Sequence, residues 1–581
     1  MHIKFLAIFM SVLLIFGLVG CTQTGTSTTG TTGTTATTAS TTAGTTAGTT
    51  AETTSGTTAE TTAGTTEPAA DPFGKYDPAI TVTSIRSTPN PATVNYLEGD
   101  SATSNEWTRL YEDRIGVKLE YKWMVDASQW ESKLNLEIAS GDIPDVFQVS
   151  MVQMYQLNEA GLLQDLASAY DMYASGYTKE IILESGPAQL DSAKIDGKLM
   201  ALPYCGLPKE SGPALMLRDD WMQKLGLESP ETFDDLVAIL DAFVKNDPDG
   251  NGKDDSYGLV MDKNLLAGGL NAAIALSFHA YPYNWVTDDT GAIVFGGIQQ
   301  ETRDLLAKLA QMYKDGLIDK ELGSKDFTKG IEPIVQGLAG VYMAPFWSPL
   351  YPLQALYNND TTIKIGYYQI PTVDGKPAKI YSPLGTIGYW VVNKNMANPE
   401  AVVKMMNVWT DVFYGNKEDS VYNELVNRPD GTEVWQNALV QTYRGFKNLD
   451  AYYNVSAAYE GKKDIKELTP EERGLVLKAQ AFDGGDPTMW AWKEIYGPEG
   501  IFKVTDRYVK ENLYVEQPYL GPPAQAELDY GTTLNDLTSQ TFIQIVTGAA
   551  PIESFDEYIS QWKASGGDEW SKQLNDFMVG R

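Results

Sequence analysis

The chain has 581 residues, with 76 acidic and 44 basic side chains and a formal net charge of −32 at pH 7. A surface this acidic repels phosphate backbones and anionic lipid headgroups, which argues against nucleic acid as a partner. The charge itself indicates a well-solvated surface and does not identify a ligand.

The N-terminus predicts export. Lys4 precedes an apolar run from Phe5 to Leu18, so residues 1–20 have the layout of a secretory signal. Leu18 to Cys21 resembles the bacterial lipobox, in which the cysteine receives a diacylglyceryl group, and two acyl chains suffice for stable anchoring. The alternative is an ordinary cleaved signal with an incidental cysteine. No later segment approaches the roughly 20 apolar residues of a membrane span.

The next segment predicts a tether. Residues 21–77 begin with Cys21 and continue mainly as Thr, Ala, Gly and Ser, without an apolar face to bury. We therefore expect a disordered linker. Cys205 is the one cysteine that remains once Cys21 is lipidated, so the folded part depends on a large core rather than on disulfides.

Alternating strand and helix patterns follow in chain order. Apolar alternation predicts strands near residues 80–82, 117–121 and 146–149, and helical spacing predicts helices over 106–115 and 130–138. This order is typical of a parallel α/β sheet. Thr232 and Asp235 form a capping signal for a further helix, and Phe555 to Trp562 has helical spacing near the C-terminus.

Catalytic chemistry has few candidates. His2 leaves with the signal, so a zinc site rich in histidine is excluded and a catalytic triad would have to use His279. Neither a nucleophile elbow nor a P-loop is present. Paired carboxylates for glycoside hydrolysis remain open, because any two of many acids could meet in the fold.

The sharpest local motif is a loop over residues 247–255 that predicts calcium binding. Oxygen donors stand at loop positions 1, 3, 5 and 9, Gly252 at the sharp turn of position 6, and a main-chain carbonyl at position 7. The predicted ligands are Asp247, Asp249, Asn251, Lys253 and Asp255. Gly258 replaces the bidentate Glu of an EF-hand at position 12, so the alternative is an empty, solvated turn.

Aromatic residues make up 11% of the chain, and aromatic rings pack on the C–H faces of sugars. Most will be core. The tryptophans next to Gly, Pro or polar residues in expected loops are the candidates for ligand contact: Trp285, Trp347, Trp390, and Trp490 with Trp492.

Several short motifs together resemble family 1 of the extracellular solute-binding proteins, the maltose-binding-like receptors of ABC importers. They occur in this order: Asn105 to Thr108, Ala139 to Asp145, Asp196 to Pro203, Leu217 to Trp221, the loop at 247–255, Gly340 to Met343 followed by Trp347, Asn398 to Ala401, and Phe555 to Gly567. Each motif is weak alone, and their order and spacing from residue 78 onward carry the resemblance.

The resemblance implies an α/β fold of the type II periplasmic-binding-protein class, with two hinge-linked lobes and a ligand cleft. The expected domains are a signal over 1–20, a linker over 21–77, and two lobes. Lobe 1 is expected over 78–207 plus about 385–430, and lobe 2 over 208–384 plus about 431–581.

The family pattern also suggests ligand contacts. Tyr204 and Glu210 would lie near the hinge and cleft, and Trp347 resembles the tryptophan that stacks on sugar. Asp142 resembles a residue of the first lobe that binds hydroxyls, and Asn105 is a further candidate at a helix start.

We therefore expect a monomeric, lipid-anchored receptor outside the cell that captures an oligosaccharide and delivers it to an ABC permease. It would have no catalytic cofactor, and Arg109 or Arg303 would serve a sugar that carries uronic acids. The alternatives are a secreted hydrolase or lyase acting on polysaccharides, and a receptor for a non-sugar solute.

Overall fold

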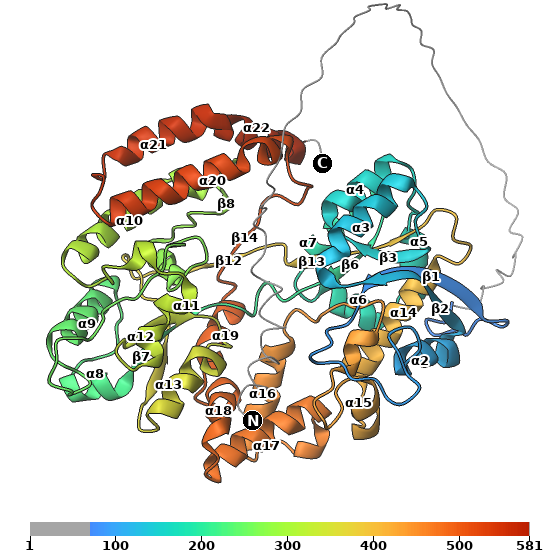
Figure 1. The fold of residues 1–581 in the computed structure, drawn as a ribbon, viewed down its shortest axis with the longest axis horizontal. Coiled ribbons are helices and arrows are strands. Elements are labelled where there is room, and N and C mark those ends of the chain that lie inside the picture. Colours follow the sequence, from blue (N-terminus) through green and yellow to red (C-terminus); the bar gives the residue numbers. More distant parts are fainter. Residues whose placement is uncertain (1–69, 580–581) are drawn as a thin grey trace, which may run out of the picture. The chain divides into compact units, whose positions relative to one another are not determined.

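The computed structural model describes residues 70–579, so the predicted signal, Cys21 and most of the predicted linker lie outside the described residues. Residues from 71 onward form one compact unit. Within this unit the buried side chains gather in separate cores, which define two lobes (Figure 1).

Lobe 1 consists of residues 71–205 and 386–440, and its buried side chains form one continuous core. Its strands are β1 (Ile80–Ser87), β2 (Val117–Val125), β3 (Val146–Val149), β4 (Lys194–Ile195), β5 (Lys198–Leu199), β6 (Leu202–Cys205) and β13 (Thr386–Val392). Its helices are α2 (Glu106–Ile115), α3 (Ala127–Ser140), α4 (Met151–Glu159), α5 (Ala167–Tyr173), α6 (Gly176–Leu183), α7 (Ala188–Ser192), α14 (Glu400–Thr410) and α15 (Asp419–Leu425).

The strand directions in lobe 1 confirm only part of the expected parallel sheet. β1 and β2 pair in parallel, as predicted for two strands joined by a helix. β13 lies between β3 and β6 and is antiparallel to both. The reason is connectivity: β13 enters lobe 1 after the chain has passed through lobe 2, so no helical crossover inside lobe 1 sets its direction.

Lobe 2 consists of residues 214–382 and 447–579. Its strands are β7 (Ala214–Arg218), β8 (Trp285–Thr287), β9 (Ile293–Phe295), β10 (Val341–Ala344), β11 (Ile365–Tyr368), β12 (Ile380–Ser382) and β14 (Tyr514–Glu516). Its helices are α8 (Asp219–Leu225), α9 (Phe233–Lys245), α10 (Gln300–Lys314), α11 (Phe327–Gly330), α12 (Glu332–Val335), α13 (Gln354–Asn359), α16 (Lys447–Tyr459), α17 (Pro470–Asp483), α18 (Trp490–Tyr496), α19 (Phe502–Lys510), α20 (Gln525–Val546), α21 (Ser554–Trp562) and α22 (Asp568–Val579).

The sheet β10-β7-β11 separates two cores in lobe 2. Leu215 and Leu217 of β7 belong to the core that the C-terminal helices α20 to α22 share with α9 and α10. Ala214 and Met216 belong to the core formed with α13 and α16 to α19. Alternate strand residues point to opposite faces, so β7, buried along its whole length, supplies both cores.

The predicted elements recur close to their expected bounds. The predicted helix over 106–115 coincides with α2, and the capping signal at Thr232 forms a reciprocal capping box at the start of α9. The expected strands at 117–121 and 146–149 correspond to β2 and β3, and the C-terminal helical spacing corresponds to α21. Local caps and periodicity were therefore sufficient for these elements.

The predicted linker extends seven residues too far. Phe73 and Tyr76 pack against the core of lobe 1, and the Tyr76 hydroxyl donates to Glu400 Oε1 at 2.7 Å. Lys404 Nζ also donates to the carbonyl oxygen of Gly74 at 2.8 Å. Two aromatic side chains give this segment apolar surface to bury, which the Thr-rich sequence before it lacks.

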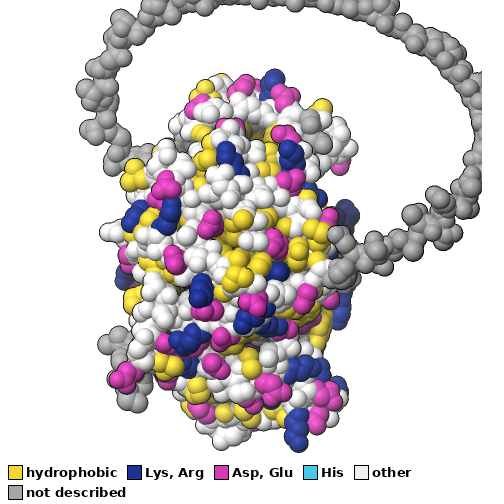
Figure 2. Space-filling view, turned by 90° about the vertical axis from the view of Figure 1, so that its right-hand side faces the viewer, with side chains coloured by type: hydrophobic (Ala, Val, Ile, Leu, Met, Phe, Trp, Pro, Cys, Tyr) yellow, Lys and Arg dark blue, Asp and Glu magenta, His cyan; other side chains and the backbone are white. Residues whose placement is uncertain are grey.

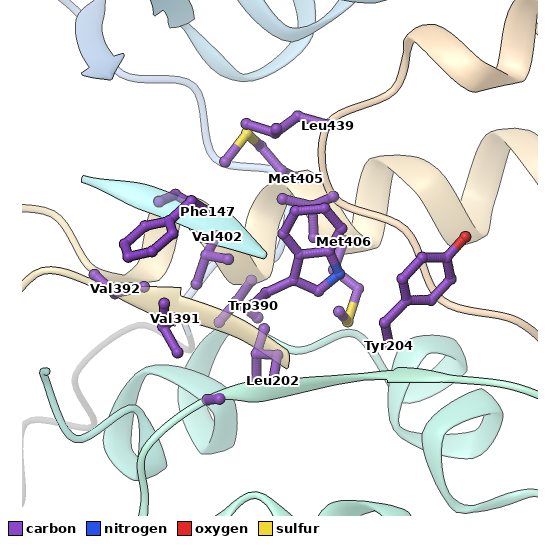
Figure 3. Close-up of a cluster of buried hydrophobic side chains, with 14 of the residues drawn as sticks. Phe147, Leu202, Tyr204, Trp390, Val391, Val392, Val402, Met405, Met406 and Leu439 are labelled. Atoms are coloured by element: carbon purple, nitrogen blue, oxygen red, sulfur yellow. The ribbon is translucent and has the colours of Figure 1, made fainter. Parts of the chain in front are cut away.

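The predicted return to lobe 2 near residue 430 is too early by about ten residues. Val434, Leu439 and Val440 are buried in the core of lobe 1, so the chain leaves lobe 1 after residue 440. Their apolar side chains complete the layer beneath α14, and Figure 3 shows Leu439 beside Met405 and Met406.

The surface agrees with a well-solvated body. Figure 2 shows acidic and basic side chains interleaved on the face it presents. Among the helices of residues 70–579, none combines the length and the apolar composition that a membrane crossing requires.

Candidate functional site

Three segments connect the lobes. We call them crossing 1 (residues 206–213), crossing 2 (residues 383–385) and crossing 3 (residues 441–446). Crossing 1 joins β6 to β7, crossing 2 joins β12 to β13, and crossing 3 precedes α16. Any change in the relative orientation of the lobes has to be accommodated in these segments.

Crossings 1 and 2 touch through backbone with no space for side chains. Gly206 N donates to Gly385 O at 2.9 Å. A Cβ atom on Gly206 would lie 2.5 Å from that same oxygen, and one on Gly385 would lie 2.7 Å from Cβ of Pro208. Gly385 also has a φ of +66°, a conformation that L side chains rarely adopt. Both positions therefore require glycine.

Crossing 3 is fastened to lobe 1 by two indoles. Trp390 Nε1 donates to Gln441 O at 2.8 Å, and Trp409 Nε1 donates to Thr442 O at 2.6 Å. The Tyr443 backbone N–H donates to Cys205 O at 3.0 Å, which ties crossing 3 to the end of β6. The core of lobe 1 thus fixes where crossing 3 begins.

Glu210 fastens crossing 1 to the other end of crossing 3. Its carboxylate accepts hydrogen bonds from Asn448 N at 2.9 Å, from Leu449 N at 3.2 Å and from the Asn448 side-chain amide. These are N–H groups of the first turn of α16, which need an acceptor. Glu210 is 2% exposed, and burial raises its pKa to about 7 against the pull of those donors.

Groups of both lobes meet around Glu471, in the first turn of α17. Its carboxylate accepts from Lys447 Nζ at 2.5 Å. Burial raises the pKa of Tyr422 of lobe 1, and the Glu471 charge adds to that effect. Burial and then Glu471 likewise raise the pKa of Tyr496 of lobe 2. α17 faces lobe 1 here, since Arg473, also on α17, contacts Asp419 of α15.

We define the interlobe site as the half-buried polar and aromatic residues around Glu471: Tyr414, Tyr422, Tyr443, Lys447, Glu471, Lys478 and Trp492. Tyr414 and Tyr422 come from lobe 1, Tyr443 from crossing 3, and the others from α16, α17 and α18. Lys478 lies two turns beyond Glu471 on α17, and its ammonium nitrogen is 3.6 Å from the centroid of the Trp492 ring.

A second contact joins the lobes beside this site. Arg473 of α17 donates to Asp419 Oδ1 of α15 at 2.6 Å and to Lys417 O at 3.0 Å. In the opposite direction, Lys417 Nζ donates to Glu467 O at 3.2 Å. The Asp419 side chain is 69% exposed, so solvent screens this ion pair.

Trp347 lies where the family pattern suggests, in a turn directly after β10, and is half-buried. Its ring packs edge-on against Phe346 with centroids 5.2 Å apart, and Phe346 stacks on Phe502 at 4.6 Å. Phe502 in turn lies 5.9 Å from Tyr496, which lies 6.4 Å from Trp492. Trp347 and Trp492 are therefore the two half-buried ends of one aromatic ladder in lobe 2.

Three of the residues predicted to bind ligand are buried in the protein interior. Trp390 is 4% exposed and Trp490 is 3% exposed, the latter stacked on Tyr357 at 4.8 Å. Asn105 is fully buried and caps α2, accepting from Trp107 N and Thr108 N. Figure 3 shows the Trp390 indole enclosed between β13 and α14. Ligand contact by these residues stays a prediction, and we leave them out of the site.

The other predicted residues are spread over the molecule. The Tyr204 hydroxyl donates to Gln441 Oε1 at 2.8 Å beside crossing 3. The Asp142 side chain is 85% exposed and pairs with Lys122 at 2.9 Å. Trp285 packs among Phe295, Trp562 and Trp570, with ring centroids 5.1 to 6.1 Å away. Of the predicted set, Glu210 lies in crossing 1, and Tyr204 and Trp390 form hydrogen bonds to Gln441 at the start of crossing 3.

The interlobe site contains residues that sequence patterns did not single out. Lys478 and Glu471 stand seven residues apart on one face of α17, a spacing that reads equally well as a solvated helix face. Trp492 was paired with Trp490 as a candidate, but residues two apart on a helix point to different faces. In the structure Trp490 is buried within the core, whereas Trp492 packs against the edge of that core and is half-buried.

The loop at 247–255 follows α9 and gathers acidic side chains. The Asn251 side-chain amide donates to Asp249 Oδ2 at 2.7 Å and to Asp255 Oδ1 at 3.0 Å. The Asp247 carboxylate accepts from Asn251 N and Gly252 N at 3.1 and 3.0 Å. Burial and then the neighbouring carboxylates raise the pKa of Asp249. Mutual repulsion of this kind is what a bound cation relieves.

The kinds of donor in this loop fit a hard divalent cation, and Gly252 has the positive φ of +75° that the sharp turn needs. The arrangement is not a complete cage. Among residues 70–579, no group of three or more His, Cys, Asp or Glu side chains has metal-binding geometry. The Asn251 amide lies between the carboxylates instead, and which of its two atoms faces them is an assignment from the hydrogen-bond pattern.

His279 lies apart from the interlobe site. Its Nε2 is 3.0 Å from Asp374 Oδ1, and this hydrogen bond, followed by that from Lys376, lowers the pKa of Asp374. The pair sits on an exposed loop of lobe 2. Among residues 70–579, no Ser or Cys side chain is hydrogen-bonded to His279, as a triad would require.

Two surface concavities lie within lobe 2 rather than between the lobes. One of about 530 Å³ lies beside the loop at 247–255 and is lined by Asp247 and Gly252 to Asp254. One of about 390 Å³ follows β11 and is lined by residues 365–369 and by Glu499 to Val504. Both are bounded by residues of lobe 2 alone.

Comparison with known proteins identifies the family. The family model described as bacterial extracellular solute-binding protein matches residues 96–411. Lipoprotein LipO of Bacillus subtilis (strain 168) is 23% identical over 482 residues, which cover 80% of this chain and 87% of LipO. The polygalacturonan/rhamnogalacturonan-binding protein YtcQ of the same strain is 24% identical over 463 residues, covering 79% of this chain and 85% of YtcQ.

The fold has relatives among solved structures. The crystal structure of alginate-binding protein AlgQ2 without calcium ion aligns with a TM-score of 0.53 and 18% identity, covering 87% of this chain and 99% of that one. A likeness at this identity shows the fold, which is the two-lobed α/β fold of the periplasmic-binding-protein class. With its family model matched over more than half of its length, the chain belongs to the bacterial extracellular solute-binding proteins.

Proposed function

We propose that this protein is a receptor outside the cell that captures an oligosaccharide between its lobes and delivers it to an ABC import permease. The observation that carries the proposal is the pairing of family membership with two separate cores joined by three crossings. A ligand that touches both lobes stabilises whichever orientation lets it do so, and the permease can then distinguish the loaded form.

Binding of a sugar is supported by the aromatic ends of the ladder in lobe 2. Trp347 and Trp492 are half-buried, and each packs against another ring of the ladder, Phe346 and Tyr496 respectively. Rings of this kind pack on the apolar face of a sugar. YtcQ and AlgQ2, which bind polysaccharides by name, point to the same ligand class.

Titration with oligosaccharides, followed by tryptophan fluorescence and by calorimetry, tests the proposal. We expect saturable binding, and Trp347→Ala should weaken it about 10-fold or more because a stacked aromatic pair contributes about 0.5–1.5 kcal/mol beyond its buried area. Trp285→Phe is the control, since Trp285 packs among Phe295, Trp562 and Trp570 within lobe 2. Equal affinity of the Trp347→Ala variant would contradict stacking at this position.

We infer that the protein binds without catalysis. The family and the relatives named for a ligand are binding proteins. An assay for reducing ends and for unsaturated products, run on the same sugars, separates the receptor from a hydrolase or lyase. Product accumulating with time at enzyme-like rates would overturn the inference.

We further propose a structural Ca²⁺ in the loop at 247–255, held by Asp247, Asp249, Asn251, Asp255 and the Lys253 carbonyl. The ion would offset the repulsion among these carboxylates and stiffen the end of α9. Adding Ca²⁺ to chelator-treated protein should raise the melting temperature, and Asp249→Asn should reduce that rise. A melting temperature that does not respond to Ca²⁺ would end this proposal.

The anchor is proposed from the sequence and from the name of LipO. Lipid on Cys21 would keep the receptor at the outer face of the cytoplasmic membrane, near the permease. Cys21→Ser should release the protein into the medium, as measured by fractionation of cells and culture supernatant. Unchanged retention at the membrane would contradict lipidation.

A further inference from the structure

Within the part of the chain that the structure describes, Lys478 is a half-buried cation without an acidic partner, which is unusual in a protein with this excess of acidic side chains. Its ammonium nitrogen lies 3.6 Å from the centroid of the Trp492 ring, and the residue is half-buried. Among residues 70–579, no acceptor forms a hydrogen bond or an ion pair with this nitrogen. Burying a cation without a counter-charge is costly, even when an aromatic face offsets part of the cost.

The charges around Lys478 leave it uncompensated. Burial lowers the pKa of Lys478, while the more distant Glu471 carboxylate acts in the opposite direction. Glu471 is itself paired with Lys447 at 2.5 Å. The neighbouring Arg473 is occupied by Asp419, and Lys493, on the same helix as Trp492, is occupied by Asp483. The nearby acids therefore already have partners, and Lys478 has none.

We infer that Lys478 and Trp492 form a subsite for a carboxylated sugar residue, a uronic acid, within the interlobe site. The ammonium would pair with the sugar carboxylate, and the uncovered part of the indole would meet the sugar ring. This inference rests on the proposed function and names the ligand class within it. It assigns to Lys478 the cationic role that the sequence had suggested for Arg109 or Arg303.

The positions of those two arginines agree with this assignment. Arg109 forms a two-point ion pair with Asp100, with nitrogen–oxygen distances of 2.7 and 3.0 Å. Arg303 lies on α10, which packs against α20 in the other core of lobe 2 (Figure 1). Neither belongs to the layer of lobe 2 that faces lobe 1 around Glu471.

A carboxylate suits this position better than a more highly charged anion. One uncompensated cation balances one negative charge, whereas the second charge of a phosphate monoester would meet Glu471 and the strongly acidic surface. The aromatic face beside the cation further favours an anion carried on a ring with apolar C–H groups.

The test uses the full-length chain and two acidic probes, galacturonate and alginate oligosaccharides, each alongside its methyl-esterified form. Esterification removes the charge and keeps the sugar skeleton. We expect the wild type to bind at least one acid form about tenfold or more tightly than its ester, since a charge-assisted hydrogen bond is worth about that factor. Lys478→Met should abolish this preference and leave ester binding unchanged, and Lys478→Arg should retain it.

Lys572→Met is the matched control, because Lys572 is exposed and pairs with Asp576 on α22. It should leave all affinities unchanged. An acid preference that survives Lys478→Met would overturn the inference, as would an equal loss of acid and ester binding. A wild type that binds neutral oligosaccharides and rejects the acids would overturn it while leaving the proposed function intact. Failure to bind any sugar would overturn both.

Discussion

Two groups of tryptophans, one in each lobe, differ in how deeply they are buried. In lobe 1, Trp107, Trp390 and Trp409 are all buried, and each indole N–H donates to a backbone carbonyl. In lobe 2, the layer formed by α16 to α19 runs from buried Trp490 to half-buried Trp347 and Trp492. These three buried tryptophans of lobe 1 therefore serve stability, and two of them anchor crossing 3, whereas Trp347 and Trp492 at the edge of lobe 2 are half-buried.

The largest expected difference is between alanine variants of one buried tryptophan, Trp390, and one half-buried tryptophan, Trp492. Trp390→Ala should lower the free energy of unfolding by about 3–5 kcal/mol, because it opens a cavity and leaves Gln441 O without its donor. Trp492→Ala should cost much less stability and reduce ligand affinity. Urea unfolding and ligand titration on both variants measure the two effects, and similar stability losses would refute the distinction.

The contribution of Glu210 to the stability of the crossings can be measured from the pH dependence of unfolding. A rise of its pKa from 4.5 to about 7 corresponds to about 3 kcal/mol. Because the folded state favours the protonated acid, this contribution is present below about pH 4.5 and is lost as the pH rises through 7. Glu210→Gln, which cannot ionise, should therefore gain stability relative to the wild type across that interval.

Urea unfolding of both proteins at several pH values between 4.5 and 8 measures this difference. Other groups, including Glu494, whose pKa burial also raises to about 7, contribute equally to both proteins and cancel. A difference that stays constant with pH would show that Glu210 ionises as freely in the folded chain as in the unfolded one.

An alanine at position 385 tests whether stability requires the close backbone contact between crossings 1 and 2. Gly385→Ala places a methyl group against Pro208 and at a φ of +66°, so we expect a loss of about 1–3 kcal/mol and a changed apparent ligand affinity. Gly375→Ala is the control, since Gly375 has a similar φ of +71° with open space around its Cβ position. Equal effects would mean that backbone strain alone, and not the contact, matters.

The smallest effect concerns the ion pair between the lobes. Arg473→Met removes the contact with Asp419, and an exposed pair contributes about 0–1 kcal/mol, so unfolding should change little. The orientation of the lobes can still respond, because this contact bridges them. Small-angle scattering and ligand affinity measure that response, and a large loss of stability would show that the pair belongs to a core rather than to a surface bridge.

The elements that sequence predicted well are those determined by local chemistry. Asn105 and Gly116 mark both ends of α2, and Thr232 with Asp235 marks the start of α9. The direction of β13 could not be predicted, because it depends on where the chain has been before it returns to lobe 1. Asn105 shows the same limit for function: a polar residue at a helix start reads as a ligand candidate until its cap is seen.

The sequence suggested that aromatic residues contact the ligand, but it did not indicate which of them lie at the interlobe site. An abundance of aromatic residues suggested a sugar, and ligand contact by half-buried Trp347 stays a prediction. Choosing between Trp490 and Trp492 required the packing of α18 against Tyr357. Lys478 carried no signal, since its significance lies in the absence of a counter-charge, which only the folded arrangement reveals.

The fastening of residues 71–77 gives the two lobes different mechanical roles in the proposed receptor. The chain enters the folded body through Tyr76 and Gly74, which are bound to Glu400 and Lys404 of α14 in lobe 1. A force applied to the chain at residue 71 would therefore reach lobe 1 before it reached the crossings. In the proposed receptor, lobe 1 would therefore be the lobe held by the preceding chain, and lobe 2 would be the lobe that turns relative to it about the crossings.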